Sequence, residues 1–243
     1  MGTMTIRYYF TLPEGVREVF NLQFDAKKLE LTGNMPDVMP SWTRLDFHQC
    51  PNCPLTPDTH PHCPLAAHLV NIVERFEGLI SYSEIQVDIM TAERFITQET
   101  TVQRGMSSLM GLLMATSGCP HMAFFKPMAR FHLPFASAEE TVYRATSMYL
   151  LAQYFLHKEG HQADLDLTGL REIYNNIEIV NVAVAKRLRT ATEADSAINA
   201  IILLDIYTKA IPVVIEESLE EIRYLFAPFF KEAEKRPSKK PTE

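Results

Sequence analysis

The four cysteines are the residues of this sequence best suited to chemistry, and each one is followed directly by proline. Two residues separate Cys50 from Cys53, a spacing that lets two sulfurs point at one tetrahedral metal ion. Cys63 follows in the same segment, and Cys119 is the last cysteine of the chain. We therefore predict that these four thiols converge on one metal centre.

The spacing leaves the identity of the metal open. A structural zinc ion is the leading prediction, because closed zinc sites take four thiolate or imidazole ligands. An iron–sulfur cluster is the alternative, since Cys-Pro pairs also occur around such clusters. A common zinc knuckle has glycine after its second cysteine, where this chain has Pro54. Nearby histidines could replace a cysteine in a mixed site, namely His48, His60, His62 and His121.

Two interpretations without a metal also stand. The cysteines could be free, buried thiols, which is a common fate of this residue. That interpretation does not explain why three of them lie in a polar, proline-rich segment. Alternatively, Cys119 could be a reactive thiol with His121 as a neighbouring base and Lys126 as a nearby cation.

The segment that carries three of the cysteines, residues 48–64, contains five prolines and no apolar periodicity. Proline lacks a backbone donor, so this segment cannot join a sheet. It is also long for a connection without secondary structure, and such loops are usually functional or disordered. A metal cross-link would order it, and a ligand at Cys119 would tie it to the second half of the chain.

Before the loop, alternating apolar residues predict strands at 6–12 and 20–24, a short apolar run at 29–31, and a further strand at 42–47. After the loop, residues 83–90 alternate again. Helical spacing predicts helices at 65–77 and 101–115. Ser137 and Glu140 form a capping box that opens a helix to about Lys158.

Two further helices are predicted near the end of the chain. One begins at Asp166 or Thr168 and ends near Thr190, and the other begins near Glu193. Pro212 should kink or divide the last helix, and Pro228 should end the regular pattern. Strands followed by helices indicate an α+β fold. We expect an N-terminal antiparallel sheet packed on a C-terminal helical bundle, joined by the Cys-Pro-rich loop.

This organisation predicts a sheet with the loop and one helix over residues 1–91, a helical bundle over 92–232, and a disordered tail over 233–243, all in one integrated unit. The chain has 243 residues, 47% of them hydrophobic, so it can bury a core without disulfides. Its net charge of −7 is spread along the chain, which argues against nucleic-acid binding. No signal peptide or transmembrane span is predicted, which favours a reducing cytoplasmic location without membrane attachment.

The sequence lacks the motifs of the common enzyme classes: no phosphate-binding loop, no dinucleotide fingerprint and no nucleophile elbow. The leading functional hypothesis is a non-enzymatic metal-binding protein, a regulatory or interaction module with an unknown protein partner. A redox or sensor protein with an iron–sulfur cluster or a reactive Cys119 is the second hypothesis. The third is a metal-free structural homo-oligomer that uses apolar helix faces such as 197–206.

Three strings, at residues 49–55, 117–122 and 131–135, carry a resemblance. They read Gln-Cys-Pro-Asn-Cys-Pro-Leu, Ser-Gly-Cys-Pro-His-Met and Phe-His-Leu-Pro-Phe. In these strings the chain resembles a family of uncharacterised bacterial proteins with Cys-Pro motifs, built on a domain of unknown function. The resemblance spans most of the chain and implies a bacterial source, and it adds no mechanism.

Overall fold

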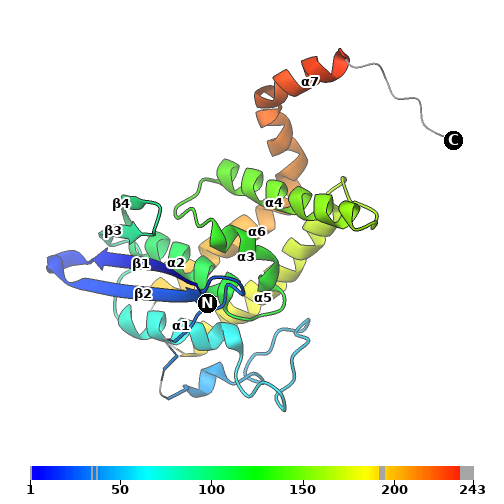
Figure 1. The fold of residues 1–243 in the computed structure, drawn as a ribbon. Coiled ribbons are helices and arrows are strands. Elements are labelled where there is room, and N and C mark those ends of the chain that lie inside the picture. Colours follow the sequence, from blue (N-terminus) through cyan, green and yellow to red (C-terminus); the bar gives the residue numbers. More distant parts are fainter. Residues whose placement is uncertain (1, 34, 37, 192–194, 236–243) are drawn as a thin grey trace.

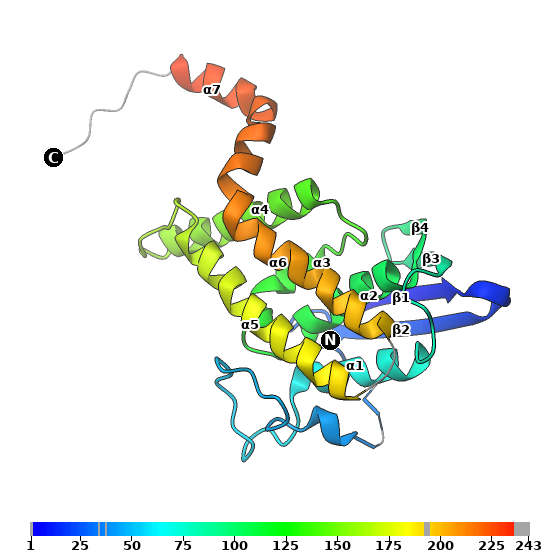
Figure 2. The same ribbon diagram turned by 180° about the vertical axis from the view of Figure 1, so that it is seen from behind.

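The computed structural model describes residues 2–33, 35–36, 38–191 and 195–235 (Figures 1 and 2). Its sheet contains the antiparallel strands β1 (Thr3–Thr11), β2 (Arg17–Asp25), β3 (Glu84–Met90) and β4 (Phe95–Thr101) in the order β2-β1-β3-β4. The helices follow almost entirely after the sheet. This arrangement confirms the predicted α+β fold with an N-terminal antiparallel sheet.

One face of the sheet is buried, and the sequence alternation explains which face. Ile6, Tyr8 and Phe10 of β1 are all buried, whereas Arg7, which alternates with them, is exposed. The same alternation in β2 and β3 adds Phe20, Leu22, Phe24, Ile85, Val87 and Ile89 to this face. Successive side chains of a strand point to opposite faces, so these residues form one continuous apolar layer.

Helices α1 (Pro64–Arg75) and α2 (Val102–Thr116) share the hydrophobic core with the sheet. Gly105 of α2 lies against it so closely that an added Cβ would stand 2.9 Å from Phe10 Cε1 and 3.1 Å from Val87 Cγ2. The remaining helices are α3 (Lys126–Arg130), α4 (Ala138–Lys158), α5 (Thr168–Ala191), α6 (Asp195–Ile222) and α7 (Ala227–Glu234). Short 3-10 turns lie at η1 (Pro13–Gly15), η2 (Ser41–Thr43), η3 (Met122–Phe125) and η4 (Arg223–Phe226).

The strand predicted at 42–47 is wrong. Thr43 donates to the Pro40 carbonyl through both its backbone N–H (3.0 Å) and its hydroxyl (2.7 Å), so the chain turns in η2. The apolar run at 29–31 forms only an isolated bridge between Phe24 and Leu31. The strand β4 was not predicted, because its residues are largely exposed and lack apolar alternation. It extends the sheet past residue 91, into the part expected to be helical.

The helix ends follow local chemistry. The Ser137 capping box is present, with Glu140 N donating to Ser137 Oγ at 3.1 Å and Ser137 N to Glu140 Oε2 at 2.8 Å. Over the described residues, α6 continues through Pro212 and is not divided there. Pro228 lies in the first turn of α7, so the prediction that it ends the pattern is wrong: proline is tolerated where no N–H is needed. The predicted helix start at Glu193 lies outside the described residues, as do residues 236–243 of the predicted tail. The prediction that the tail begins at residue 233 is wrong, because α7 extends to Glu234.

Candidate metal centre

The four cysteines line one small cavity, although Cys119 is distant from the others in sequence. The cavity has a volume of about 20 Å³ and lies where the loop 48–64 meets α5 and the segment after α2. Figure 2 shows this loop beside α5. The other lining residues are His121, Arg187, Leu45, Leu55, Pro64, Leu65, Val180, Ala183 and Val184.

Each cysteine is positioned by backbone hydrogen bonds. Cys53 N donates to the Cys50 carbonyl at 3.0 Å, which closes the turn between the two. Cys63 N donates to the Thr43 carbonyl at 2.7 Å, and α1 begins at the next residue, Pro64. Helix α1 therefore anchors the end of the loop.

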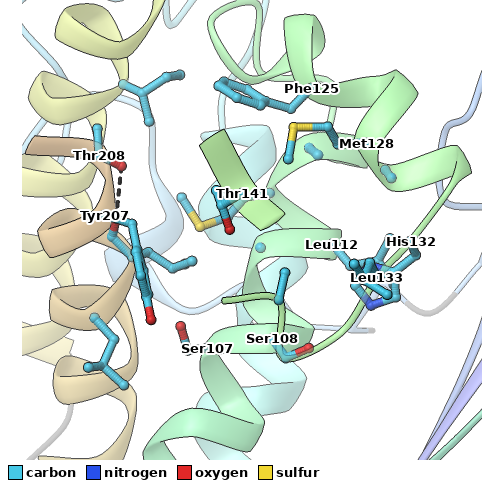
Figure 3. A pocket seen from close by; sticks show the side chains of 18 of the residues that line it. Ser107, Ser108, Leu112, Phe125, Met128, His132, Leu133, Thr141, Tyr207 and Thr208 are labelled. Atoms are coloured by element: carbon cyan, nitrogen blue, oxygen red, sulfur yellow. Dashed lines mark hydrogen bonds between the residues drawn. The ribbon is translucent and has the colours of Figure 1, made fainter. Parts of the chain in front are cut away.

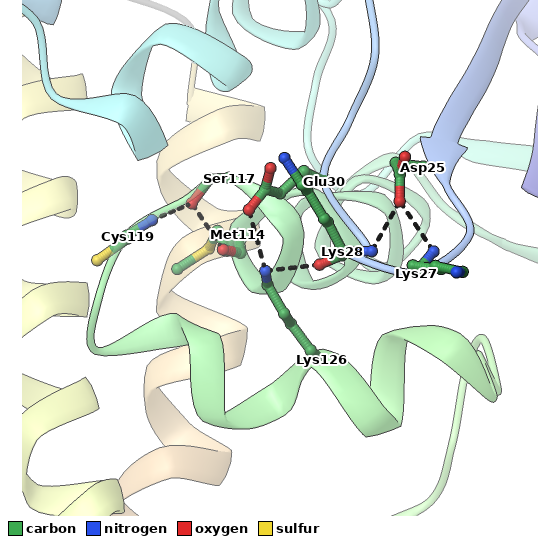
Figure 4. Close-up of polar contacts among 8 residues, drawn as sticks. All are labelled: Asp25, Lys27, Lys28, Glu30, Met114, Ser117, Cys119 and Lys126. Atoms are coloured by element: carbon green, nitrogen blue, oxygen red, sulfur yellow. Dashed lines mark hydrogen bonds and ion pairs between the residues drawn. The ribbon is translucent and has the colours of Figure 1, made fainter. Parts of the chain in front are cut away.

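Cys119 lies in the turn that follows α2. Its N–H donates to Ser117 Oγ at 3.2 Å, and that hydroxyl donates to the Met114 carbonyl at 2.8 Å (Figure 4). Gly118 has a φ of 86°, a conformation that glycine adopts without strain. The end of α2 and this glycine together direct Cys119 toward the loop.

A short chain of polar contacts joins the same three segments. His121 Nε2 donates at 2.7 Å to the carbonyl of Asn52, a residue that lies between Cys50 and Cys53 in the sequence. Asn52 Nδ2 in turn donates to Asn176 Oδ1 of α5 at 2.9 Å. The Cys119 turn, the Cys50–Cys53 turn and α5 are thus held together by groups other than the thiols.

Arg187 of α5 is the cation of this cavity. Its residue exposure is 2%, and its Nη1 donates to the carbonyls of Trp42 at 2.5 Å and Arg44 at 2.6 Å. Sequence reasoning missed this residue. A signal was available, because Arg187 falls on the apolar stripe of α5 that contains Val180, Val184 and Leu188.

The thiols and the guanidinium influence one another. Burial foremost, and then the neighbouring thiols of Cys63, Cys119 and Cys53, raise the pKa of Cys50 to about 12, while Arg187 acts against them. Burial also raises the pKa of Cys119, opposed by the backbone N–H groups of Met122 and His121 at its sulfur. Burial lowers the pKa of Arg187, and the cysteines oppose that shift. The cavity therefore disfavours several uncompensated thiolates at once.

Of the four histidines predicted as substitute ligands, only His121 lines the cavity. The described residues that line it do not include His48, His60 or His62. Their imidazoles contact hydroxyls instead: His48 that of Thr190, His60 that of Thr59, and His62 that of Thr43.

Lys126, the cation considered for a reactive Cys119, has other partners. It donates to the Lys28 carbonyl at 2.7 Å and pairs with Glu30 at 3.4 Å, as Figure 4 shows.

Across the described ranges, no group of three or more His, Cys, Asp or Glu side chains is arranged so that it could hold a metal ion. The four thiols thus share a cavity without forming a coordination sphere. None of the helices within those ranges is long and apolar enough to cross a membrane.

A family model described as "Domain of unknown function (DUF6901)" matches residues 6–227, and the chain belongs to this family. No curated protein and no solved structure matches the chain.

Proposed function

We propose that this protein binds a single structural zinc ion through Cys50, Cys53, Cys63 and Cys119, and that the ion ties the loop 48–64 to the helical part. The observation that carries the proposal is the shared cavity, which all four cysteines line. If the cysteines had no common role, all four would not be expected to line the same cavity. All four are free thiols and therefore available as ligands.

The size of the cavity favours one ion over a cluster. A water molecule needs roughly 10–15 Å³ of such space, and this cavity has about 20 Å³. It therefore accommodates one particle of that size, whereas an iron–sulfur cluster requires room for several atoms. This is the reason to place zinc before the iron–sulfur alternative.

The surroundings of the thiols support binding as thiolates. Four thiolates around one Zn²⁺ carry a net negative charge, which Arg187 offsets from within the cavity wall. The backbone N–H groups of His121 and Met122 likewise favour the thiolate form of Cys119, because they act to lower its pKa. Partners of this kind orient ligands and tune a metal site.

A site with four protein ligands leaves no open coordination position for a substrate, which favours a structural role over catalysis. We accordingly propose a non-enzymatic protein. Thiolate ligands persist in reducing compartments, which supports a cytoplasmic location. The resemblance of the Cys-Pro strings supports a bacterial source.

We also propose that the protein is an interaction module, whose partner is another protein or a second copy. Exposed aromatic residues support this: Tyr224 and Phe229 are each 72% exposed, in η4 and α7. Figure 1 shows α7 standing away from the body of the molecule. In contrast, Ala197, Ala200 and Ile201, part of the face first considered for self-association, are buried within the chain.

Elemental analysis of protein purified without an affinity metal, together with its visible spectrum, tests the metal proposal. We expect about one zinc per chain and no colour. Cys119→Ser should lose the zinc. His60→Ala is the matched control, because His60 lies in the same loop but is exposed and does not line the cavity, and it should keep the zinc.

The other outcomes separate the alternatives. Iron with sulfide and a brown colour would contradict zinc and support an iron–sulfur cluster with a redox or sensor role. Absence of metal with rapid, selective alkylation of Cys119 would support a reactive thiol instead.

Light scattering on a size-exclusion column tests the interaction surface. If copies of the chain associate through α7, the double variant Tyr224→Ser, Phe229→Ser should shift the mass of the wild-type species to that of a monomer. Wild-type protein that is already a monomer would leave only another protein as the partner.

A further inference from the structure

A second, much larger cavity lies between α2, α3, α4, α5 and α6 (Figure 3). Its volume is about 520 Å³, within the range of about 300–1,000 Å³ that is typical of small-molecule sites. Figure 3 shows Tyr207 and Thr208 of α6 across the space from Phe125 and Met128. Most of the wall is apolar, including Leu112, Met122, Phe125, Met128, Ile177 and Leu204.

One acceptor in this wall lacks a donor. Asn181 is 1% exposed, and its Nδ2 donates to Thr208 Oγ1 at 3.0 Å. The Thr208 hydroxyl uses its own proton to donate to the Leu204 carbonyl at 2.8 Å, so it can only accept from Asn181. This fixes the amide orientation and leaves Asn181 Oδ1 without a hydrogen-bond partner among the described residues. Buried acceptors are rarely left in this state.

One cation in the wall lacks an anion. Arg144 of α4 donates from Nη2 to the carbonyls of Met128 (3.0 Å) and Phe131 (2.9 Å), which orients its guanidinium at the cavity. No carboxylate of the described residues lies within ion-pair distance of it, and the carboxylate of Glu140, one turn away, accepts from Ser137 N. The Nε and Nη1 donors of Arg144 are therefore available to a ligand.

Two polar side chains of the same wall, Ser108 and His132, are already hydrogen-bonded to Tyr8. Tyr8 OH is hydrogen-bonded both to His132 Nε2 at 2.5 Å and to Ser108 Oγ at 3.0 Å. This contact connects the segment after α3 to β1 and forms a fixed side of the cavity. His132 is consequently part of the wall, and its Nε2 is already engaged.

We propose that this cavity binds a medium-length apolar carboxylic acid that carries a hydroxyl group. The carboxylate would pair with Arg144, the hydroxyl would donate to Asn181 Oδ1, and the hydrocarbon would cover the apolar wall. The volume of about 520 Å³ lies in the range of sites for drug-sized ligands, so an acid of about ten carbons fits. A neutral apolar ligand would leave a partly buried guanidinium without a counter-charge.

Isothermal titration calorimetry on the full chain tests this site with four probes of one length: decanoate, 3-hydroxydecanoate, 10-hydroxydecanoate and 1,10-decanediol. We expect decanoate to bind, and at least one hydroxylated acid to bind about tenfold more tightly through the added hydrogen bond. The uncharged diol should bind at least about tenfold more weakly than the hydroxylated acids, because it cannot pair with Arg144.

Three variants assign these effects to residues. Arg144→Met should weaken decanoate binding about tenfold or more, whereas Arg189→Met, at an exposed arginine near the end of α5, should not. Asn181→Leu should abolish the advantage of the hydroxylated acid and leave decanoate binding unchanged. Gly111 lines the cavity, and an added Cβ would meet only Leu204 Cδ2, at 3.6 Å. Gly111→Leu should therefore take up part of the space and weaken the binding of every probe in a folded protein.

Absence of heat with all four probes would overturn the proposal. So would equal affinity for the diol and the hydroxylated acids, or undiminished decanoate binding in folded Arg144→Met. If Arg144→Met does not fold, the decision rests on Gly111→Leu: probe binding that this substitution leaves undiminished places the probes elsewhere and also refutes the site.

Discussion

Helix α5 contributes to the walls of both cavities, the small one lined by the four cysteines (the thiol cavity) and the large one of about 520 Å³. On one side of α5, Val180, Val184 and Arg187 line the thiol cavity, while Ile177 and Asn181 line the large one. The cation of the small cavity is satisfied by backbone carbonyls of the chain itself. In the large cavity, Arg144 donates to carbonyls through Nη2 alone, and Asn181 Oδ1 lacks a donor within the described part of the chain. A polar group completed by its own chain stabilises the fold, and one left incomplete points to a ligand.

The largest expected effect is that of removing metal from the thiol cavity. At free zinc about a thousandfold above its dissociation constant, binding adds about 4 kcal/mol to the free energy of unfolding. We expect a chelator to lower the urea-unfolding free energy by about this amount. Cys119→Ser should be insensitive to the chelator. A wild type that is equally insensitive would contradict a structural metal.

Arg187 should come next. Arg187→Met leaves the carbonyls of Trp42 and Arg44 without their buried donor, at a cost of about 3 kcal/mol in the free energy of unfolding. The same substitution at the exposed Arg189 should change it by less than about 0.5 kcal/mol. Urea unfolding of both variants measures the difference. Equal effects would show that the guanidinium does not hold the loop.

His132 at the wall of the large cavity should make stability depend on pH. Burial, and secondarily the positive charge of Arg144, lower the pKa of His132 from 6.5 to about 3. The unfolded chain therefore binds one more proton than the folded chain between these values, and stability falls as the pH drops below 6.5. At pH 5 the loss amounts to about 2 kcal/mol.

His132→Gln keeps a hydrogen-bonding group for Tyr8 but does not titrate in this range. Urea unfolding at pH 7.5 and pH 5.0 should show that the variant loses about 2 kcal/mol less than the wild type. Equal losses would mean that His132 becomes charged without penalty in the folded protein.

The smallest expected effect concerns two glycines of α2 that face different surroundings. Gly111→Ala should raise the free energy of unfolding by up to about 1 kcal/mol, because alanine favours the helix and the cavity has room. Gly105→Ala should lower it, since its Cβ would meet Phe10 at 2.9 Å in the packed core. Thermal melts of the two variants should therefore shift in opposite directions. Shifts of the same sign would contradict the difference in packing.

Much of the fold could be predicted because the signals are local. Alternation at Ile6, Tyr8 and Phe10 predicts a strand with one buried face, and the structure buries all three. The capping box at Ser137 predicts a helix start, and it forms. Both signals depend on residues a few positions apart, whose geometry the backbone dictates.

The incorrect predictions arose where tertiary context outweighs the local pattern. Trp42 and Leu45 are buried, as a strand would require, but they lie in turns whose carbonyls accept from Arg187, far along the chain. The strand β4 has no apolar pattern of its own and forms by pairing with β3. Neither outcome can be derived from a window of ten residues.

By itself, the sequence determined the α+β class, the main strands and helices, and the thiol set that could bind a metal, because these follow from periodicity and residue type. Only the tertiary structure decided that Cys119 shares a cavity with the loop cysteines, that Arg187 enters it, and that Arg144 and Asn181 line a second one. The physical reason is that burial and pairing of polar groups depend on contacts between distant segments. Such contacts arise from the packing of whole helices, and the spacing of residues along the chain does not encode them directly.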